Sequence, residues 1–116
     1  MSSIEVKSFS NADEINTDFN NARIDAVNVG GQRVLQLTLQ PGWKWSNDIK
    51  PVVGTDSCQA THLGVIVAGT VKAIHNDGTE ATYTAGDAYS IQPGHDGMVV
   101  GNDPAIVYEF AGAWGE

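Results

Sequence analysis

Hydrophobic residues recur at every second position in short runs along this chain, and glycines separate the runs. After the pair Gly30-Gly31, the side chains of Leu35, Leu37 and Leu39 fall on one face of an extended strand, because successive residues of a strand point to opposite faces. The glycine pair and the later sequence Asn76-Asp77-Gly78 are typical of tight hairpin turns, which need positive φ angles. The pattern therefore indicates β-strands joined by hairpins.

About eight short strands with frequent tight turns predict an all-β sandwich or barrel. Hairpins alternate with longer connections, which favours a jelly roll made of two sheets. The expected strands cover residues 22–29, 34–39, 43–45, 58–68, 71–75, 79–84, 88–91, 98–100 and 105–110. The stretch 46–55 contains Pro51 and Gly54, and we expect an irregular loop there over one end of the barrel.

The length of 116 residues corresponds to one domain with a modest single core. Residues 22–116 are expected to form the barrel domain. Residues 1–21 are mixed and polar, and we expect them to form an N-terminal arm that packs on the barrel.

Charge and termini limit the partners and the location of the protein. The 14 acidic residues outnumber the 6 lysines and arginines and give a net charge of −8, whereas nucleic acids and anionic membrane surfaces attract basic patches. The N-terminus lacks the apolar run of a signal peptide, and no segment approaches the ~20 apolar residues of a membrane helix. The single cysteine, Cys58, has no internal disulfide partner. We expect a cytoplasmic protein that binds neither nucleic acid nor membranes.

Two stretches resemble the two halves of a known family signature. Gly86-Asp87, a short strand and the Pro93-Gly94 corner are similar to the second half of the cupin signature, and Thr61–Gly69 is similar to the first half. A subset of small cupins is also similar to this chain over residues 41–46, 54–59 and 93–96. The resemblance covers about residues 35–110 and implies a cupin-type double-stranded β-helix, a jelly-roll barrel whose mouth usually holds a metal.

The usual metal ligands of cupins are replaced by other residue types in this chain. Cupins typically bind the metal through two histidines one residue apart, a glutamate and a third histidine. Counted from the turn glycines of the two motifs, the glutamate position falls on His62, and the paired histidines fall near Asp56 and Cys58. The third histidine position falls on Gly97, two residues after His95.

A metal site formed by His62, His95 and Cys58 is one hypothesis. Imidazole suits Zn, Fe or Ni, thiolate favours the softer ions, and the loop acids Asp48 and Asp56 are further donors. On one continuous strand Cys58 and His62 would stand about 13 Å apart at ~3.3 Å per residue, and they would touch only at a bulge. The alternative is a hydrogen-bonded barrel histidine and a corner histidine. One divalent transition metal (Zn, Fe, Ni or Mn) and no cofactor at all are therefore equal alternatives.

An internal pocket for a small organic molecule is a second hypothesis. Apolar and aromatic side chains line most ligand cavities, and the candidates for such a wall are Trp43, Trp45, Tyr89 and Met98. The alternative is that the two tryptophans only fill the barrel, since tryptophans in β-cores mostly serve packing.

A catalytic interpretation uses the same three polar residues. His62 is the candidate general base, because histidine titrates near neutral pH, and His95 is its candidate partner. Cys58 is a candidate nucleophile if a neighbouring cation lowers the pKa of its thiol. Buried single cysteines are otherwise inert small hydrophobes.

The resemblance to cupins implies two kinds of function. One is lyase, isomerase or oxygenase chemistry on a small acid or sugar-like substrate, centred on His62. The alternative is a non-catalytic ligand sensor or a dimerising cupin module without metal. Both imply a homodimer, because cupins commonly pair through sheet edges or the N-terminal arm and open edges need covering.

Overall fold

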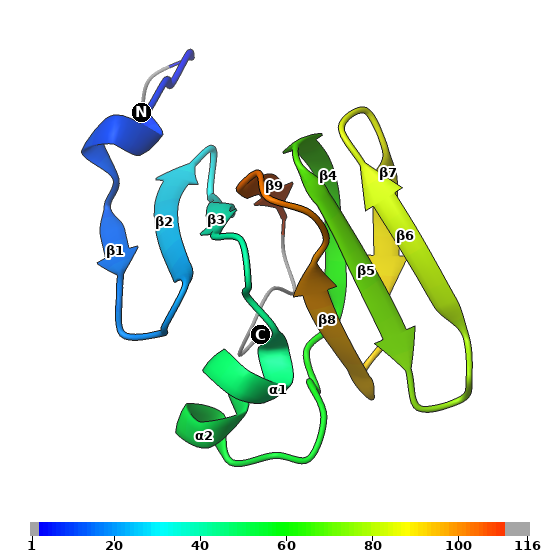
Figure 1. Ribbon diagram of the computed structural model, residues 1–116. Helices are drawn as coiled ribbons and strands as arrows, with labels where there is room; N and C mark the ends of the chain where they lie inside the picture. The colour runs from blue at the N-terminus through cyan, green and yellow to red at the C-terminus, as the bar shows by residue number, and fades with distance from the viewer. Residues whose placement is uncertain (1–2, 111–116) are drawn as a thin grey trace.

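The computed structural model describes residues 3–110, and its strands form two antiparallel β-sheets (Figure 1). The larger sheet has the strand order β1-β2-β3-β9-β4-β7, and the smaller has the order β6-β5-β8. The strands of the larger sheet are β1 (Glu14–Asn16), β2 (Ala22–Val29), β3 (Gln32–Leu39), β9 (Ala105–Glu109), β4 (His62–Ala68) and β7 (Ala88–Ile91). The strands of the smaller sheet are β6 (Glu80–Thr84), β5 (Thr70–His75) and β8 (His95–Val99).

The strand order confirms the predicted all-β fold of two sheets. Strand β9 lies between β3 and β4, so residues close to the end of the chain join two earlier parts of the larger sheet. Such crossing connections are typical of a jelly roll and absent from a simple meander. The hairpin predicted at Asn76-Asp77-Gly78 is also confirmed, because it joins β5 to β6 in register.

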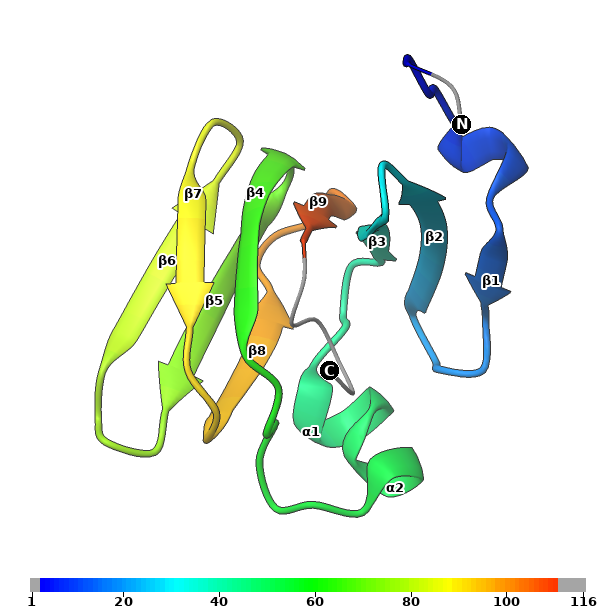
Figure 2. The same cartoon turned by 180° about the vertical axis from the view of Figure 1, so that it is seen from behind.

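Two short helices replace the irregular loop expected at residues 46–55. They are α1 (Trp45–Asp48) and α2 (Lys50–Val53), and they lie together at one end of the sheets (Figure 2). Pro51 lies in the first turn of α2, where a backbone N–H has no partner within the helix, so the missing N–H of proline costs no hydrogen bond. Gly54 ends α2 with a φ of 79°. The strand expected at 43–45 is wrong for the same reason, since Trp45 begins α1.

The core lies between the two sheets and extends to the helices. Leu35, Leu37 and Leu39 of β3 are buried, as their alternation predicts. Trp45 and Ile49 of the helical segment add to this core and are at most 3% exposed. The core therefore continues past the sheets to the end of the barrel that the helices cover.

The first 21 residues contribute a 3₁₀ turn, η1 (Phe9–Asn11), and strand β1. β1 pairs with β2 and extends the larger sheet, and the ring of Phe9 packs on Tyr108 with centroids 5.3 Å apart. Residues 111–116 of the expected barrel domain lie outside the described residues.

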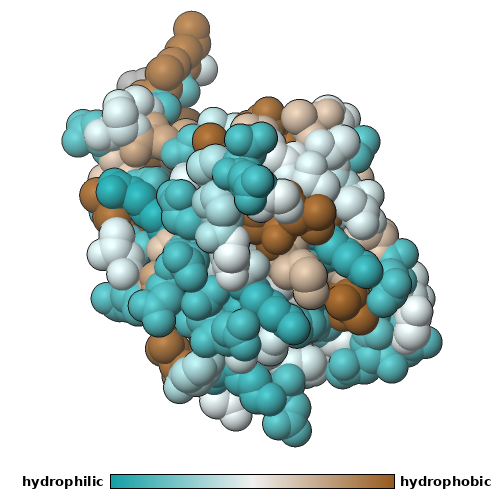
Figure 3. All heavy atoms as spheres, viewed as in Figure 1, coloured by the Kyte–Doolittle hydropathy of each residue, from teal (hydrophilic) through white to brown (hydrophobic). Residues whose placement is uncertain are grey.

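The face seen in Figure 3 is mostly hydrophilic, and its hydrophobic residues form small separate groups. Within residues 3–110 no helix has the length and apolar character needed to cross a membrane.

Candidate metal centre

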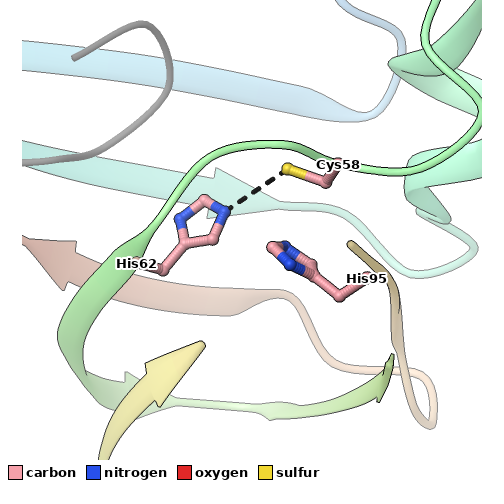
Figure 4. A group of neighbouring side chains, drawn as sticks. All are labelled: Cys58, His62 and His95. Atoms are coloured by element: carbon pink, nitrogen blue, oxygen red, sulfur yellow. Dashed lines mark hydrogen bonds between the residues drawn. The ribbon is translucent and has the colours of Figure 1, made fainter. Parts of the chain in front are cut away.

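Three buried side chains that can bind metals meet in the interior of the protein (Figure 4). The ligand atoms of Cys58, His62 and His95 all lie within 4.8 Å of one another. None of these residues is more than 5% exposed. Sγ of Cys58 is 3.6 Å from Nε2 of His62, and the two imidazole rings have centroids 5.0 Å apart. The three residues singled out in the sequence thus form one cluster.

The backbone brings the cluster together by a bend that alternation along a strand does not reveal. Strand β4 begins only at His62, so residues 58–61 do not extend it. Cys58 instead pairs with His95 in an isolated β-bridge, in which the N–H of Cys58 donates to the carbonyl oxygen of His95 at 2.7 Å. The expected separation of about 13 Å along one strand is therefore wrong, because Cys58 and His62 do not belong to the same strand.

Each imidazole of the cluster has a hydrogen-bond partner at Nδ1. Nδ1 of His62 lies 2.8 Å from Oε1 of Glu109, and Nδ1 of His95 lies 2.8 Å from the carbonyl oxygen of Gln92. Histidines that bind metals typically coordinate through one nitrogen and donate the other N–H to a carboxylate or a carbonyl. This arrangement directs Nε2 of His62 toward Cys58, and Nε2 of His95 is the ring nitrogen that would coordinate a metal.

Glu109 of β9 is a buried carboxylate that the sequence analysis did not select. It is 4% exposed, and its Oε2 accepts a hydrogen bond of 2.6 Å from the hydroxyl of Tyr89. Gly64 of β4 pairs with both Tyr89 and Glu109. A Cβ on Gly64 would lie 2.9 Å from the Tyr89 hydroxyl and 2.9 Å from Cγ of Glu109. The two side chains therefore meet over the space that the missing side chain of Gly64 leaves.

The sequence did contain a signal for Glu109. It follows Val107 by two residues, so the alternation of β9 places a charged side chain on the same face as a buried valine. A charged residue in an inward row is buried only when partners compensate its charge. Such a residue is therefore a candidate site residue.

The cluster favours an ion pair between the thiol and an imidazole. Burial raises the pKa of Cys58, but hydrogen bonds with His62 and His95 prevail and lower it to about 6. Burial lowers the pKa of His62, but Cys58 and Glu109 prevail and raise it to about 9. Burial, together with the Glu109 carboxylate, raises the pKa of Tyr89, which stays a hydrogen-bond donor. Both shifts favour a thiolate on Cys58 and an imidazolium on His62 when no metal is bound.

The donor set fits a divalent transition metal. Zn–S distances of ≈ 2.3 Å and Zn–N distances of ≈ 2.0–2.1 Å in a tetrahedron place sulfur and nitrogen about 3.6 Å apart. Sγ of Cys58 and Nε2 of His62 are 3.6 Å apart. Three protein ligands leave a fourth position open, as in catalytic zinc sites. Thiolate and imidazole favour zinc over magnesium or manganese, which prefer oxygen ligands.

The two loop acids proposed as further donors lie elsewhere. Oδ2 of Asp48 accepts a hydrogen bond of 3.0 Å from the backbone N–H of Lys44. The side chain of Asp56 is fully exposed and lies 3.9 Å from Nζ of Lys50. Neither carboxylate belongs to the cluster of Cys58 and the two histidines.

Two cavities adjoin the cluster. The inner cavity, between the sheets, has a volume of about 40 Å³, and the outer cavity, beside the helices, has a volume of about 500 Å³. Polar groups of the inner lining come from His62, Tyr83, Tyr89, His95, Asp96 and Glu109. The outer lining consists of Asn16, Phe19, Ile24, Arg33, Leu35, Trp45, Ile49, Val53, Thr55, Cys58, Gln59 and Ala60. The imidazoles thus face the inner cavity, and Cys58 faces the outer one.

Of the four residues proposed as the wall of a ligand pocket, three lie around these cavities. Trp43, Trp45 and Tyr89 line the inner cavity, and Trp45 also lines the outer one. Met98 lines neither, because it alternates with the buried residues His95, Gly97 and Val99 of β8 and points to the other face. Within the described residues, Nε1 of Trp43 is a buried side-chain nitrogen without a hydrogen-bond partner.

Comparison with solved structures identifies the fold as the cupin-type double-stranded β-helix that the sequence predicted. An oxalate decarboxylase–formate complex from Lactobacillus farciminis matches 100% of this chain and 36% of its own, at 14% identity and a TM-score of 0.62. A Klebsiella pneumoniae protein with a double-stranded β-helix domain matches 90% of this chain and 81% of its own, at 16% identity and a TM-score of 0.58. A Rhizobium leguminosarum protein of unknown function matches 94% and 97%, at 13% identity and a TM-score of 0.64.

Neither models of known protein families nor curated protein sequences give a match to this chain. The similarity to solved structures therefore concerns the fold. The chain spans about a third of the oxalate decarboxylase chain that it matches.

Proposed function

We propose that the protein binds one divalent transition metal, with zinc as the preferred ion, and through it a small organic molecule. The ligands would be Sγ of Cys58 and Nε2 of His62 and His95. The observation that carries the proposal is the Nδ1 hydrogen bond of each imidazole, to Glu109 and to the Gln92 carbonyl, at 2.8 Å in both cases. Three buried donors of this kind within 4.8 Å of one another support a coordination site.

The proposal gives the surrounding residues defined tasks. A bound divalent ion would supply Lewis acidity, which polarises a carbonyl or lowers the pKa of a bound water. Glu109 accepts a hydrogen bond from Nδ1–H of His62 and thereby fixes the orientation of the ring. The hydroxyl of Tyr89 donates a hydrogen bond to Glu109 and holds that carboxylate in place. His62 and His95 would then act as metal ligands. This role replaces the role of general base that the sequence suggested for His62. Zinc has no redox chemistry, so we favour lyase or isomerase chemistry over oxygenase chemistry.

Metal content tests the proposal directly. We expect about one zinc per chain in protein purified without added metal or chelator, measured by inductively coupled plasma mass spectrometry. Cys58→Ser and His95→Ala should lose the metal, whereas Asp56→Asn should keep it because that carboxylate lies outside the cluster. Circular dichroism would establish that the variants remain folded.

The rival function is a metal-free cupin module with a reactive or ligand-sensing thiolate. The contact between Cys58 and His62, at 3.6 Å, and a Cys58 pKa near 6 support it. No metal after reloading with Zn, Fe, Ni and Mn would overturn the metal proposal. Rapid alkylation of Cys58 by iodoacetamide at pH 7 in protein with no metal would then favour the rival.

A further inference from the structure

The outer cavity has the size and the walls of a small-molecule site. Its volume of about 500 Å³ falls within the ≈ 300–1,000 Å³ typical of such sites. One wall is the inward face of β2 and β3, and the opposite wall is the helical segment with Trp45 and Ile49. Both walls are mainly apolar, so the cavity suits a ligand with an apolar body.

Arg33 is the unusual member of this lining. It precedes Leu35 by two residues in β3, so its side chain leaves the strand on the same face as the buried Leu35 and Leu37. Among the described lining residues, Arg33 is the one with a positive charge. An arginine at the end of a row of buried leucines therefore places a cation in an apolar cavity.

One partner of Arg33 is a carboxylate on the solvent side, that of Glu14. Nη2 of Arg33 lies 2.8 Å from Oε2 of Glu14, whose side chain is 57% exposed compared with 33% for Arg33. Such a solvent-accessible ion pair contributes little to stability. A ligand carboxylate that enters the cavity can therefore replace the Glu14 carboxylate at small cost and gain a partner that is less screened by water.

We propose that the outer cavity binds a monoanionic organic acid with an apolar body, whose carboxylate pairs with Arg33. The planar guanidinium matches a carboxylate with two parallel N–H···O bonds. A single charge on the ligand is favoured because Arg33 is the one cation among the described lining residues and the chain carries a net charge of −8. This inference rests on the proposed function, since Cys58 in the same lining places the ligand beside the metal centre.

The experiment compares three probes that share one body: 3-phenylpropionate, 3-phenylpropanamide and 2-phenylethyl phosphate. Isothermal titration calorimetry should detect binding of the carboxylate, with the amide at least tenfold weaker because it carries no charge for Arg33. The phosphate should also be weaker, because its second charge has no partner in the cavity. Equal binding of acid and amide, or tighter binding of the phosphate, would overturn the inference.

Two variants that break the same ion pair provide matched controls. Arg33→Gln should weaken binding of 3-phenylpropionate at least tenfold, whereas Glu14→Gln should strengthen it a few-fold by removing the competing carboxylate. Both variants lose the contact at 2.8 Å, so a folding defect caused by that loss would affect both alike. Parallel changes in affinity would assign Arg33 a structural role and overturn the inference.

Metal analysis of the same samples separates this inference from the proposed function. Metal without any binding of 3-phenylpropionate would overturn the acid site and leave the metal centre. Acid binding that depends on Arg33 in protein that never takes up metal would support the acid site and overturn the metal centre.

Discussion

The inner and outer cavities adjoin the same cluster but differ in volume and in the chemical character of their linings. The inner cavity holds about 40 Å³ and is surrounded by groups that already bind one another, such as Glu109 with His62 and Tyr89. The outer cavity holds about 500 Å³ and has mainly apolar walls, with Arg33 as the one cationic side chain among the described lining residues. The inner region has room for about one or two waters, whereas the outer region has room for an organic ligand.

The difference shows how one barrel separates positioning from binding. Polar groups of the inner region fix the imidazoles before any ligand arrives, and such preorganised partners are what metal sites require. The outer region leaves space and apolar surface, which favour an exchangeable ligand. Cys58 is the residue common to both tasks, because it belongs to the cluster and lines the outer cavity.

The largest effect should follow from filling the space over Gly64. In Gly64→Ala the new Cβ would lie 2.5 Å from the carbonyl oxygen of Tyr108 and 2.9 Å from the Tyr89 hydroxyl. We expect a loss of about 3 kcal/mol or more in the free energy of unfolding, because the backbone of β9 must move. Thermal and urea unfolding would measure it.

Gly97→Ala is the matched control for this variant. A Cβ on Gly97 would meet the nearest heavy atom, in the ring of Trp43, at 3.6 Å, which is an ordinary contact. We expect a change below about 1 kcal/mol. Equal destabilisation by both substitutions would contradict the prediction that the short contacts at Gly64 cause the loss of stability.

The affinity for zinc should rise with pH. The pKa of Cys58 is about 6 and that of His62 about 9, so between these values the thiol has already lost its proton and the imidazole has not. Zinc must then displace one proton from His62, and its affinity should increase about tenfold per pH unit between pH 6.5 and 8.5. Competition with a chelator of known pH dependence would measure this slope, and a flat profile would contradict the ion pair.

Substitutions of Glu109, which contacts His62, and of Tyr89, which contacts Glu109, should have smaller effects, and these effects are on zinc affinity. Glu109→Gln keeps the size of the side chain but removes its charge, and we expect about 10–100-fold weaker zinc binding. Tyr89→Phe removes only the hydrogen bond of 2.6 Å to Glu109, so we expect a loss below about tenfold. Tyr83→Phe is the control, because Tyr83 stacks on Tyr89 at 4.4 Å and its substitution should leave zinc affinity unchanged. The reverse order would contradict the chain from Tyr89 through Glu109 to His62.

Alternation along the sequence determined most of the fold and, in part, the site. It placed Leu35, Leu37 and Leu39 in the core and the hairpin at residues 76–78, because a strand has a period of two and tight turns need glycine. It failed at Trp45, where a helical turn replaced a strand. The alternating tryptophans give no information on the packing of α1 against β8, which stabilises this helical turn.

Residue type alone selected Cys58, His62 and His95, since few other side chains bind transition metals. Only the tertiary structure decided that they meet, because the bend at residues 58–61 and the β-bridge from Cys58 to His95 join segments whose distance no local pattern encodes. The same holds for Glu109 and Arg33. Alternation shows that each stands in an inward row, but the partner that compensates its charge comes from another strand, and strand pairing is decided by long-range packing.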